Sequence, residues 1–378
     1  MKFLHLADLH LGKRIGDYDL SDVQEDILSK LINYIVENNI DTIVIAGDIY
    51  DTRDPSAKAT SLLDNFLSKA HENNINILMI SGNHDQEDKL HFASNILKDN
   101  NIYIVTNIKD SLKPVTIDNV NFYLLPFINK YDVKSYFGDE ASNIDSVADA
   151  ISFVINKMSI NKDEKNVIVS HQAVLGSKCK TCTSGSEVSV EKDKDGMIGG
   201  EDIVPSSVYK DFDYVALGHI HKALNIESNM RYPGALLKYH KDEANNKKSF
   251  TIVDTDDFSI KEIEIKPKRD VVLLKGKFEE LRKQKEFSND YVFFELTDKD
   301  YISEPMAKLK LDFPFAAGLS YFRKETDTIK VEQTEYEDID KLSKFDLFND
   351  FYKMQLGEEM NDEQKKIVND IIKEIWGN

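Results

Sequence analysis

The chain has 378 residues, enough for one large domain and one or two small ones, and 41% of them are hydrophobic, as in a globular protein. Acidic residues outnumber basic ones 67 to 48, and the formal net charge of −19 argues against holding nucleic acid through the overall field of the protein. No stretch approaches the ~20 apolar residues of a membrane span, the first residues do not form a signal peptide, and two cysteines make no disulfide framework, so we expect a cytoplasmic protein.

The first 80 residues alternate between strand and helix patterns. Strand periodicity covers residues 2–7, 42–46 and 75–80, and helical spacing covers residues 21–38 and 56–73. Ser21 and Gln24 are spaced as a capping box at the start of the first helix. This alternation predicts parallel strands with helices packed on the outside.

The following segments add further strands and two regions of different character. Predicted strands cover residues 102–105, 115–117, 120–125, 166–170, 214–217, 249–254 and 259–265, with a turn at residues 118–119 and a helix over residues 142–158. Residues 176–200 form a long polar loop, and loops of this length are usually functional or mobile. We place domain boundaries so that residues 1–265 form the main domain, 266–335 a small α+β module and 336–378 a pair of helices.

Five polar stretches occur at or near the ends of these apolar runs. They are Asp8-Leu9-His10, Gly47-Asp48, Gly82-Asn83-His84-Asp85, His171 and Gly218-His219-Ile220-His221. Each alone has a structural explanation as a turn, a helix cap or a satisfied polar pair. Five such stretches occur in order, and four of them come directly after a strand. Together they predict that their side chains converge on one edge of the sheet.

The residue types in these stretches indicate metal chemistry. Asp, Asn and His offer oxygen and nitrogen ligands that suit Mn, Fe or Zn better than Ca or a thiolate site. Seven candidate ligands exceed the need of one ion, so we expect two ions that share a bridging carboxylate, about 3.5–4 Å apart. Such a pair performs phosphoester hydrolysis.

The ordered set D-x-H, G-D-x-x-D, G-N-H-D, H and G-H-x-H is similar to the signature of calcineurin-like metallophosphoesterases. Within that superfamily, residues 3–12 and 213–221 resemble the bacterial SbcD and Mre11-type nuclease family. The resemblance implies an α/β fold with two β-sheets flanked by helices (αββα), followed by a small α+β capping domain and a C-terminal helix pair.

The resemblance also implies a role for each site residue. Asp8, His10, Asp48 and His221 would hold one divalent ion, and Asp48, Asn83, His171 and His219 the other, with Mn²⁺ as the expected metal. His84 would be the catalytic histidine, close to the leaving oxygen as a general acid or charge stabiliser.

The implied activity is manganese-dependent cleavage of DNA, as a double-strand exonuclease and a single-strand or hairpin endonuclease in repair, recombination and replication. The implied partners are DNA and an SbcC/Rad50-like ATPase, with two copies of this chain in a heterotetramer. Two alternatives stay open: a free-standing phosphoesterase for a small nucleotide or a phosphoprotein, and an inert scaffold. The extra domain and helices after residue 266 argue against a free-standing phosphoesterase, because a small substrate does not need them. The complete set of ligands argues against an inert scaffold.

Two features depart from the family pattern. Asp51 stands where archaeal and eukaryotic relatives have a second active-site histidine, which we interpret as the bacterial pattern. Cys179 and Cys182 form a C-x-x-C pair, but a zinc site needs four ligands, so we expect them to be incidental loop residues.

The tail predicts two amphipathic helices. Apolar residues recur at helical spacing from residue 338 to 354 and again from 367 to 376, and Gly357 is placed to end the first helix. Asn361 and Gln364 are spaced as the capping box of the second. We expect the apolar faces to dock on the coiled-coil base of the ATPase, unless the helices bury them on each other or on the body.

Overall fold

The computed structural model describes residues 1–176, 181–182, 190–191, 203–300, 302–322, 343–356 and 359–376. Its centre consists of two six-stranded sheets. The first has the strand order β18 (Ser259–Glu264), β17 (Ser249–Asp254), β1 (Lys2–Leu6), β4 (Thr42–Ala46), β5 (Asn76–Ile80) and β6 (Ile102–Val105). The second has the order β15 (Leu224–Glu227), β16 (Met230–Tyr232), β14 (Tyr214–Gly218), β9 (Lys165–His171), β8 (Val120–Leu125) and β7 (Val115–Ile117).

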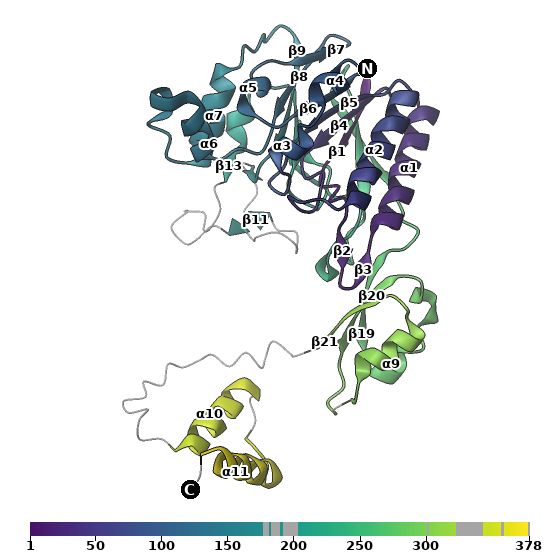
Figure 1. The fold of residues 1–378 in the computed structure, drawn as a ribbon, viewed down its shortest axis with the longest axis vertical. Coiled ribbons are helices and arrows are strands. Elements are labelled where there is room, and N and C mark those ends of the chain that lie inside the picture. The colour runs from purple at the N-terminus through teal and green to yellow at the C-terminus, as the bar shows by residue number, and fades with distance from the viewer. Residues whose placement is uncertain are drawn as a thin grey trace.

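The two sheets pack face to face through a fully buried apolar layer. Phe3 on β1 contacts Phe122 on β8 and Tyr214 on β14, with ring centroids 5.4 and 5.8 Å apart. Helices α1 (Ser21–Glu37) and α2 (Ala57–Glu72) cover the outer face of the first sheet, and α6 (Lys130–Phe137) and α7 (Val147–Lys157) lie on the side of the second (Figure 1). The αββα architecture implied by the resemblance is therefore confirmed.

The strands that precede the polar stretches are parallel within each sheet. β1, β4, β5 and β6 pair in parallel in the first sheet, and β8, β9 and β14 do so in the second. The expectation of one sheet edge is wrong, because β1, β4 and β5 belong to one sheet and β9 and β14 to the other. The polar stretches meet where the carboxyl ends of two packed sheets come together.

The predicted capping box at the start of α1 is also wrong. Leu20 is the N-cap residue of α1 and makes no side-chain cap bond. The buried side chain of Gln24 instead accepts the N–H of Gly12 at 3.0 Å and donates to the carbonyl of His10 at 2.7 Å. Gln24 therefore braces the turn after β1, because a helix side chain that faces the sheet reaches that turn.

Other predicted helices differ at their ends. The helix expected over residues 142–158 is α7, which starts only at Val147 because Ser146 and Asp149 form its capping box. The shorter elements of the main domain are β2 (Arg14–Ile15), β3 (Tyr18–Asp19), α3 (Glu87–Leu90), α4 (Ser94–Lys98), α5 (Ile108–Ser111), β10 (Val174–Leu175), β11 (Thr181–Cys182), β12 (Val190–Glu191) and β13 (Val204–Pro205).

A small three-stranded parallel sheet follows β18. It contains β19 (Val271–Gly276), β20 (Tyr291–Leu296) and β21 (Ala316–Tyr321), with helices α8 (Phe278–Leu281) and α9 (Pro305–Asp312). It contacts the main domain through Tyr18, whose hydroxyl donates to the carbonyl of Pro314 at 2.9 Å. The guanidinium of Arg269 stacks 3.6 Å from the ring centroid of Phe315 and lies 3.8 Å from the carboxylate of Asp22.

The tail contains α10 (Lys344–Leu356) and α11 (Asp362–Trp376). The predicted capping box of α11 is confirmed, since Asn361 and Gln364 exchange two hydrogen bonds of 2.9 Å. Several parts of the predictions lie outside the described residues: Gly357, residues 323–342 and the side chains of Cys179 and Cys182. Within the described ranges, no helix is long and apolar enough to cross a membrane.

A candidate dinuclear metal centre

The strand ends place all the predicted site residues around one point between the sheets. Asp8 and His10 follow β1, Asp48 follows β4, Asn83 and His84 follow β5, His171 ends β9, and His219 and His221 follow β14. Four of them have left-handed backbone conformations, with φ of 55° at Asp8, 42° at His10, 51° at Asp48 and 107° at His219. Such strain clusters at functional sites, where the surrounding structure enforces it.

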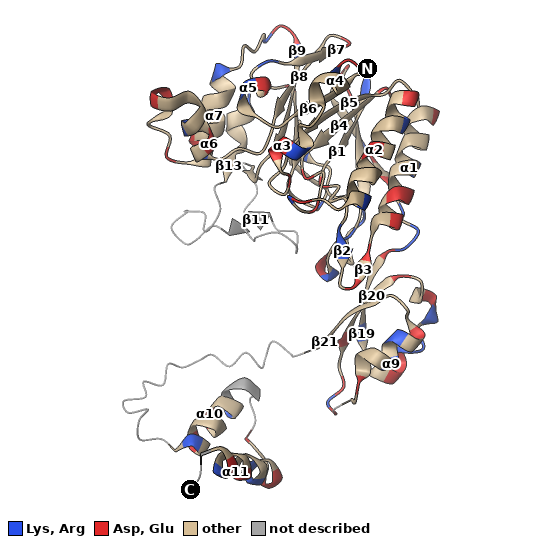
Figure 2. Cartoon of the chain, in the orientation of Figure 1, with Lys and Arg blue, Asp and Glu red and all other residues tan. Residues whose placement is uncertain are grey.

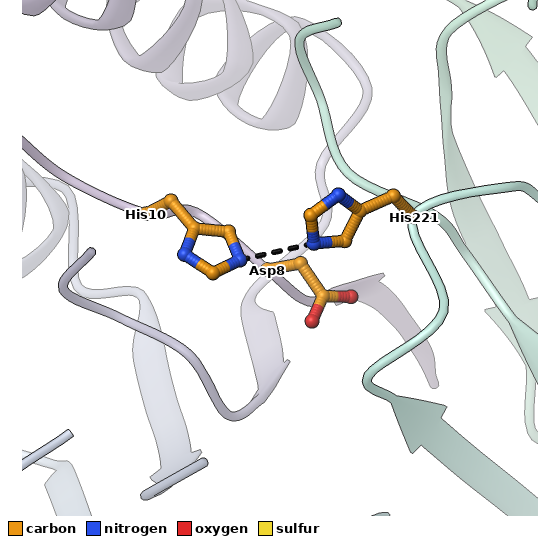
Figure 3. Close-up of side chains that lie close together, drawn as sticks. All are labelled: Asp8, His10 and His221. Carbon is orange, nitrogen blue, oxygen red and sulfur yellow. Dashed lines mark hydrogen bonds between the residues drawn. The ribbon is translucent and has the colours of Figure 1, made fainter. Parts of the chain in front are cut away.

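One ligand group consists of Asp8, His10 and His221, whose ligand atoms all lie within 4.8 Å of one another. The two imidazoles face each other, with their Nε2 atoms 3.0 Å apart and the carboxylate of Asp8 beside them (Figure 3). All three residues are buried. Two ring nitrogens and a carboxylate that converge in a buried place fit a divalent cation.

The second ligand group is centred on Asp48. One carboxylate oxygen of Asp48 lies 3.4 Å from Nε2 of His171 and 3.6 Å from Nε2 of His10, so it stands between the two groups as a bridging ligand would. The amide oxygen of Asn83 lies 3.1 Å from Nε2 of His171 and 3.3 Å from Nδ1 of His219. The buried His and Asp residues therefore fit a dinuclear metal site.

Backbone contacts fix the orientation of these side chains. Nδ1 of His171 donates to the carbonyl of Ala46 at 2.7 Å, which turns Nε2 toward Asp48. Asp8 accepts the N–H of His219 at 3.0 Å, and Asp48 accepts the N–H of His84 at 3.0 Å. Asp8 thus connects the turn after β1 with the turn after β14, and Asp48 connects the turn after β4 with the turn after β5.

The glycines of the motifs leave the space that the ligands occupy. A Cβ at Gly82 would overlap the carboxylate and backbone nitrogen of Asp48, and one at Gly218 would overlap the carbonyl of Ala46. Gly47 has φ of 84°, and its Cβ would overlap the ring of His171. These positions require glycine because backbone and ligand approach too closely for a side chain.

Burial and charge act against each other in the site. Burial raises the pKa of Asp8 to about 7, with His171 lowering it and Asp48 raising it further. Burial lowers the pKa of His219 to about 3 and that of His221 to about 4, so both imidazoles are neutral at pH 7 and can offer lone pairs. Burial, the largest single cause, lowers the pKa of His171, but the charge and hydrogen bond of Asp48, the charge of Asp8 and the carbonyl of Ala46 together outweigh it, and the pKa rises to about 9. Cations would stabilise this arrangement of buried carboxylates.

His84 lies at the margin of the site and is only half-buried. Its Nδ1 donates to the carbonyl of Asp51 at 2.9 Å, and its ring centroid lies 5.0 Å from that of His10. The neighbouring Asp85 has a different task. Its carboxylate accepts N–H groups of Ile49, Tyr50 and Gly82 at 2.9–3.1 Å and so ties the two turns together.

Sequence reasoning missed several residues that surround the centre. Glu243 lies in a short 3₁₀ helix (Lys241–Glu243), and its carboxylate reaches Nδ1 of His221 at 3.6 Å. Lys248 is 2.5 Å from the same carboxylate. Neither residue follows a strand or stands in a motif, so no pattern in the sequence distinguishes them from surface residues.

Comparison with known proteins gives two matching family models. The calcineurin-like phosphoesterase model matches residues 1–223, and the model described as the type 5 capsule protein repressor C-terminal domain matches residues 267–355. The D subunit of the nuclease SbcCD of Staphylococcus saprophyticus is 32% identical over 382 residues, which cover 98% of each chain. That of Staphylococcus epidermidis is 32% identical over 330 residues, covering 85% of each chain.

Two solved structures align with this chain at lower sequence identity. A protein of Thermus thermophilus aligns with a TM-score of 0.41 at 10% identity, covering 70% of this chain and 99% of that one. A dimetal phosphatase from Danio rerio aligns with a TM-score of 0.34 at 14% identity, covering 67% of this chain and 91% of that one.

The crowding around Asp48 gives a first testable prediction. Gly82→Ala should weaken Mn²⁺ binding by about tenfold or more, because the added methyl group must displace the shared carboxylate. Calorimetric titration of the metal-free protein measures this. Gly276→Ala is the control, since its Cβ would meet only the flexible end of Leu281 at 3.2 Å. Equal Mn²⁺ affinity in both variants would contradict the proposed importance of this carboxylate's position.

Proposed function

Because this chain belongs to the SbcD nuclease-subunit family of the calcineurin-like phosphoesterases, we propose that it is a metal-dependent nuclease that hydrolyses DNA phosphodiester bonds. The observation that carries the proposal is the meeting of two ligand groups at the single carboxylate of Asp48. A relative that aligns over nearly its whole length is named as the D subunit of the SbcCD nuclease. That name supports DNA as the substrate and an SbcC-like ATPase as the partner.

The proposed metal ligands follow from the two groups. Asp8, His10, Asp48 and His221 hold one ion, and Asp48, Asn83, His171 and His219 hold the other. We propose Mn²⁺, the metal that the resemblance implies, from among the ions that a mixed set of imidazole and carboxylate ligands suits. When bound, the two ions lower the pKa of a water molecule and neutralise charge on the phosphate. The buried protein groups orient the ligands and exclude bulk water.

His84 is the proposed catalytic histidine. The hydrogen bond from its Nδ1 to the carbonyl of Asp51 fixes the ring and leaves Nε2 as the atom that holds or donates a proton. Its backbone N–H is bound to Asp48, so the ring has a fixed place relative to the proposed bridge. A proton donated from Nε2 would stabilise the leaving oxygen of the cleaved strand.

The exposed faces of the tail helices support the partner assignment. On α10 the side chains of Leu347, Phe348 and Phe351 are 39%, 43% and 54% exposed. On α11 Ile367, Ile371 and Ile375 recur every fourth residue and are 53%, 47% and 61% exposed. We infer that this apolar face docks in a groove of the coiled-coil base of an SbcC-like ATPase. A DNA substrate and such a partner are consistent with a protein of the cytoplasm.

A second pair of exposed apolar residues lies on the segment that follows Asn83 and His84 in the sequence and supports a homodimer. Phe92 and Ile96, at the junction of α3 and α4, are 80% and 69% exposed. Exposed apolar side chains mark an association surface where they form a contiguous patch, and we propose Phe92 and Ile96 as members of such a patch. Both follow closely after Asn83 and His84, so a second copy bound here would bring two active sites into one assembly of two nuclease chains and two ATPase chains.

The substrate class can be tested directly. With Mn²⁺ the purified protein should cleave double-stranded and hairpin DNA, in the presence of its ATPase, and a chelator should abolish the cleavage. A small phosphodiester such as bis(p-nitrophenyl) phosphate is the comparison substrate. Efficient hydrolysis of the small ester without cleavage of DNA would favour a free-standing phosphoesterase. Cleavage of DNA in chelator-treated, metal-stripped protein would contradict the metal mechanism.

His84→Gln tests the role of the proposed catalytic histidine. We expect a loss of roughly 10²–10⁴ in the cleavage rate, the usual effect of removing a positioned proton donor. Metal content and DNA binding should stay unchanged, because the proposed ligands are intact. A variant that loses Mn²⁺ instead would place His84 among the metal ligands. This alternative has a structural basis, because the ligand atoms of His84, His10 and Asp51 lie within 4.8 Å of one another.

Removal of residues 336–378 tests both proposed association surfaces. The truncated protein should still bind Mn²⁺ and form dimers, because the metal ligands, Phe92 and Ile96 remain, but it should no longer bind the ATPase. Pull-down with the ATPase and light scattering measure the two properties. Unchanged ATPase binding would contradict the docking of the tail helices, and a monomeric mass of the full chain would contradict the homodimer.

A further inference from the structure

We propose that Asp51 and Glu243 are positioning residues for the ion between His10 and His221, and that each is held in place by its own lysine. The inference rests on the proposed metal site. Glu243 stands in none of the sequence motifs, and Asp51 ends the G-D-x-x-D motif, where the resemblance gives it no role. Asp51 stands where archaeal and eukaryotic relatives have a second active-site histidine. We assign Asp51 the role of a positioning residue instead.

His10 and His221 have matching surroundings. Their inner Nε2 atoms face each other at 3.0 Å. On the outer side, Nδ1 of His10 lies 3.4 Å from a carboxylate oxygen of Asp51, and Nδ1 of His221 lies 3.6 Å from one of Glu243. Neither distance is that of a hydrogen bond, and the buried Nδ1 of His10 has no hydrogen-bond partner among the described residues, so the carboxylates act through their charge. A negative charge this close to the outer nitrogen favours the proton on Nδ1, directs the lone pair of Nε2 inward and increases the basicity of the ligand.

Each carboxylate is paired with a lysine. Nζ of Lys13 lies 2.7 Å from Asp51, and Nζ of Lys248 lies 2.5 Å from Glu243 and donates to the carbonyl of His221 at 2.9 Å. Glu243 is fully buried and the Lys248 side chain is 5% exposed. A buried ion pair is a poor source of stability because desolvation opposes it, so its placement behind a candidate ligand indicates a functional reason.

The other half of the centre lacks such a carboxylate behind His171. The outer nitrogen of His171 donates to the neutral carbonyl of Ala46 at 2.7 Å. His171 therefore differs from His10 and His221, each of which has a carboxylate near its outer nitrogen. We expect these two carboxylates to increase affinity for the ion between His10 and His221 and to have little effect on the other.

Metal titration of the full-length protein separates positioning from a purely structural role. The variants are Asp51→Asn, which keeps the shape of the side chain and loses its charge, and the double variant Glu243→Gln with Lys248→Gln, which removes the buried pair together. Mn²⁺ is titrated into the metal-free proteins and followed by calorimetry and by electron paramagnetic resonance. Each variant should lower the affinity for one of two ions by about 10–100-fold and leave the second ion unchanged.

Asp242→Asn is the matched control, because Asp242 lies next to Glu243 and contacts the exposed His240 at 3.0 Å, away from the proposed ligands. It should bind both ions as the wild type does. The melting temperature of each metal-free protein shows whether a variant is folded. Should the double variant not fold, Asp51→Asn decides alone, since its side chain is 19% exposed and the backbone contact of Asp51 with His84 is kept.

The outcomes distinguish this inference from the proposed function. A wild-type protein that binds two ions, together with folded variants that bind both with unchanged affinity, would overturn the positioning role alone. A wild-type protein that binds fewer than two ions would overturn the proposed dinuclear site itself. Selective loss of affinity for one ion, absent from Asp242→Asn, would support the inference.

Discussion

The buried charge of Asp48 is the constraint around which the centre of the molecule is built. Its side chain is 3% exposed and lies within 3.6 Å of the Nε2 atoms of His10 and His171. A buried carboxylate is costly unless charges and hydrogen bonds compensate it. The left-handed backbone at Asp48 and the crowded glycine at Gly82 both follow from this need, because the turns of β4 and β5 must close around one side chain.

The candidate ligands come from two sheets, so the site depends on how the sheets pack. Asp8, His10 and Asp48 stand on the first sheet, and His171 and His221 on the second. The aromatic contacts of Phe3 with Phe122 and Tyr214 set the spacing of the sheets. Since interiors are close-packed and transmit strain, a change in this layer alters the distance between the two halves of the site. The core thus has a direct part in the geometry of the site.

The sequence could predict the strands and the polar turns at their ends, because apolar runs and the polar residues after them are local patterns. It could not predict residues whose role depends on tertiary contact. Gln24 has the spacing of a cap, yet the packing of α1 on the first sheet directs it to the turn at His10. Glu243 stands 22 residues after His221 in a polar segment, and only the fold brings its carboxylate to that ring. The two sheets were likewise implied only by the resemblance, since strand patterns do not tell which sheet a strand joins.

The net negative charge of the chain does not by itself prevent the binding of DNA. In Figure 2, basic and acidic residues are mixed along α2 and α11, whereas α1 is mainly acidic, and the total of −19 is spread over the whole chain. At physiological ionic strength, exposed charges more than about 8 Å apart are largely screened. A phosphate at the site would therefore respond to the groups around Asp48, where two bound divalent ions would outweigh the two carboxylates proposed as ligands, Asp8 and Asp48. Local charge at the strand ends, and not the net charge of the chain, decides whether DNA can approach.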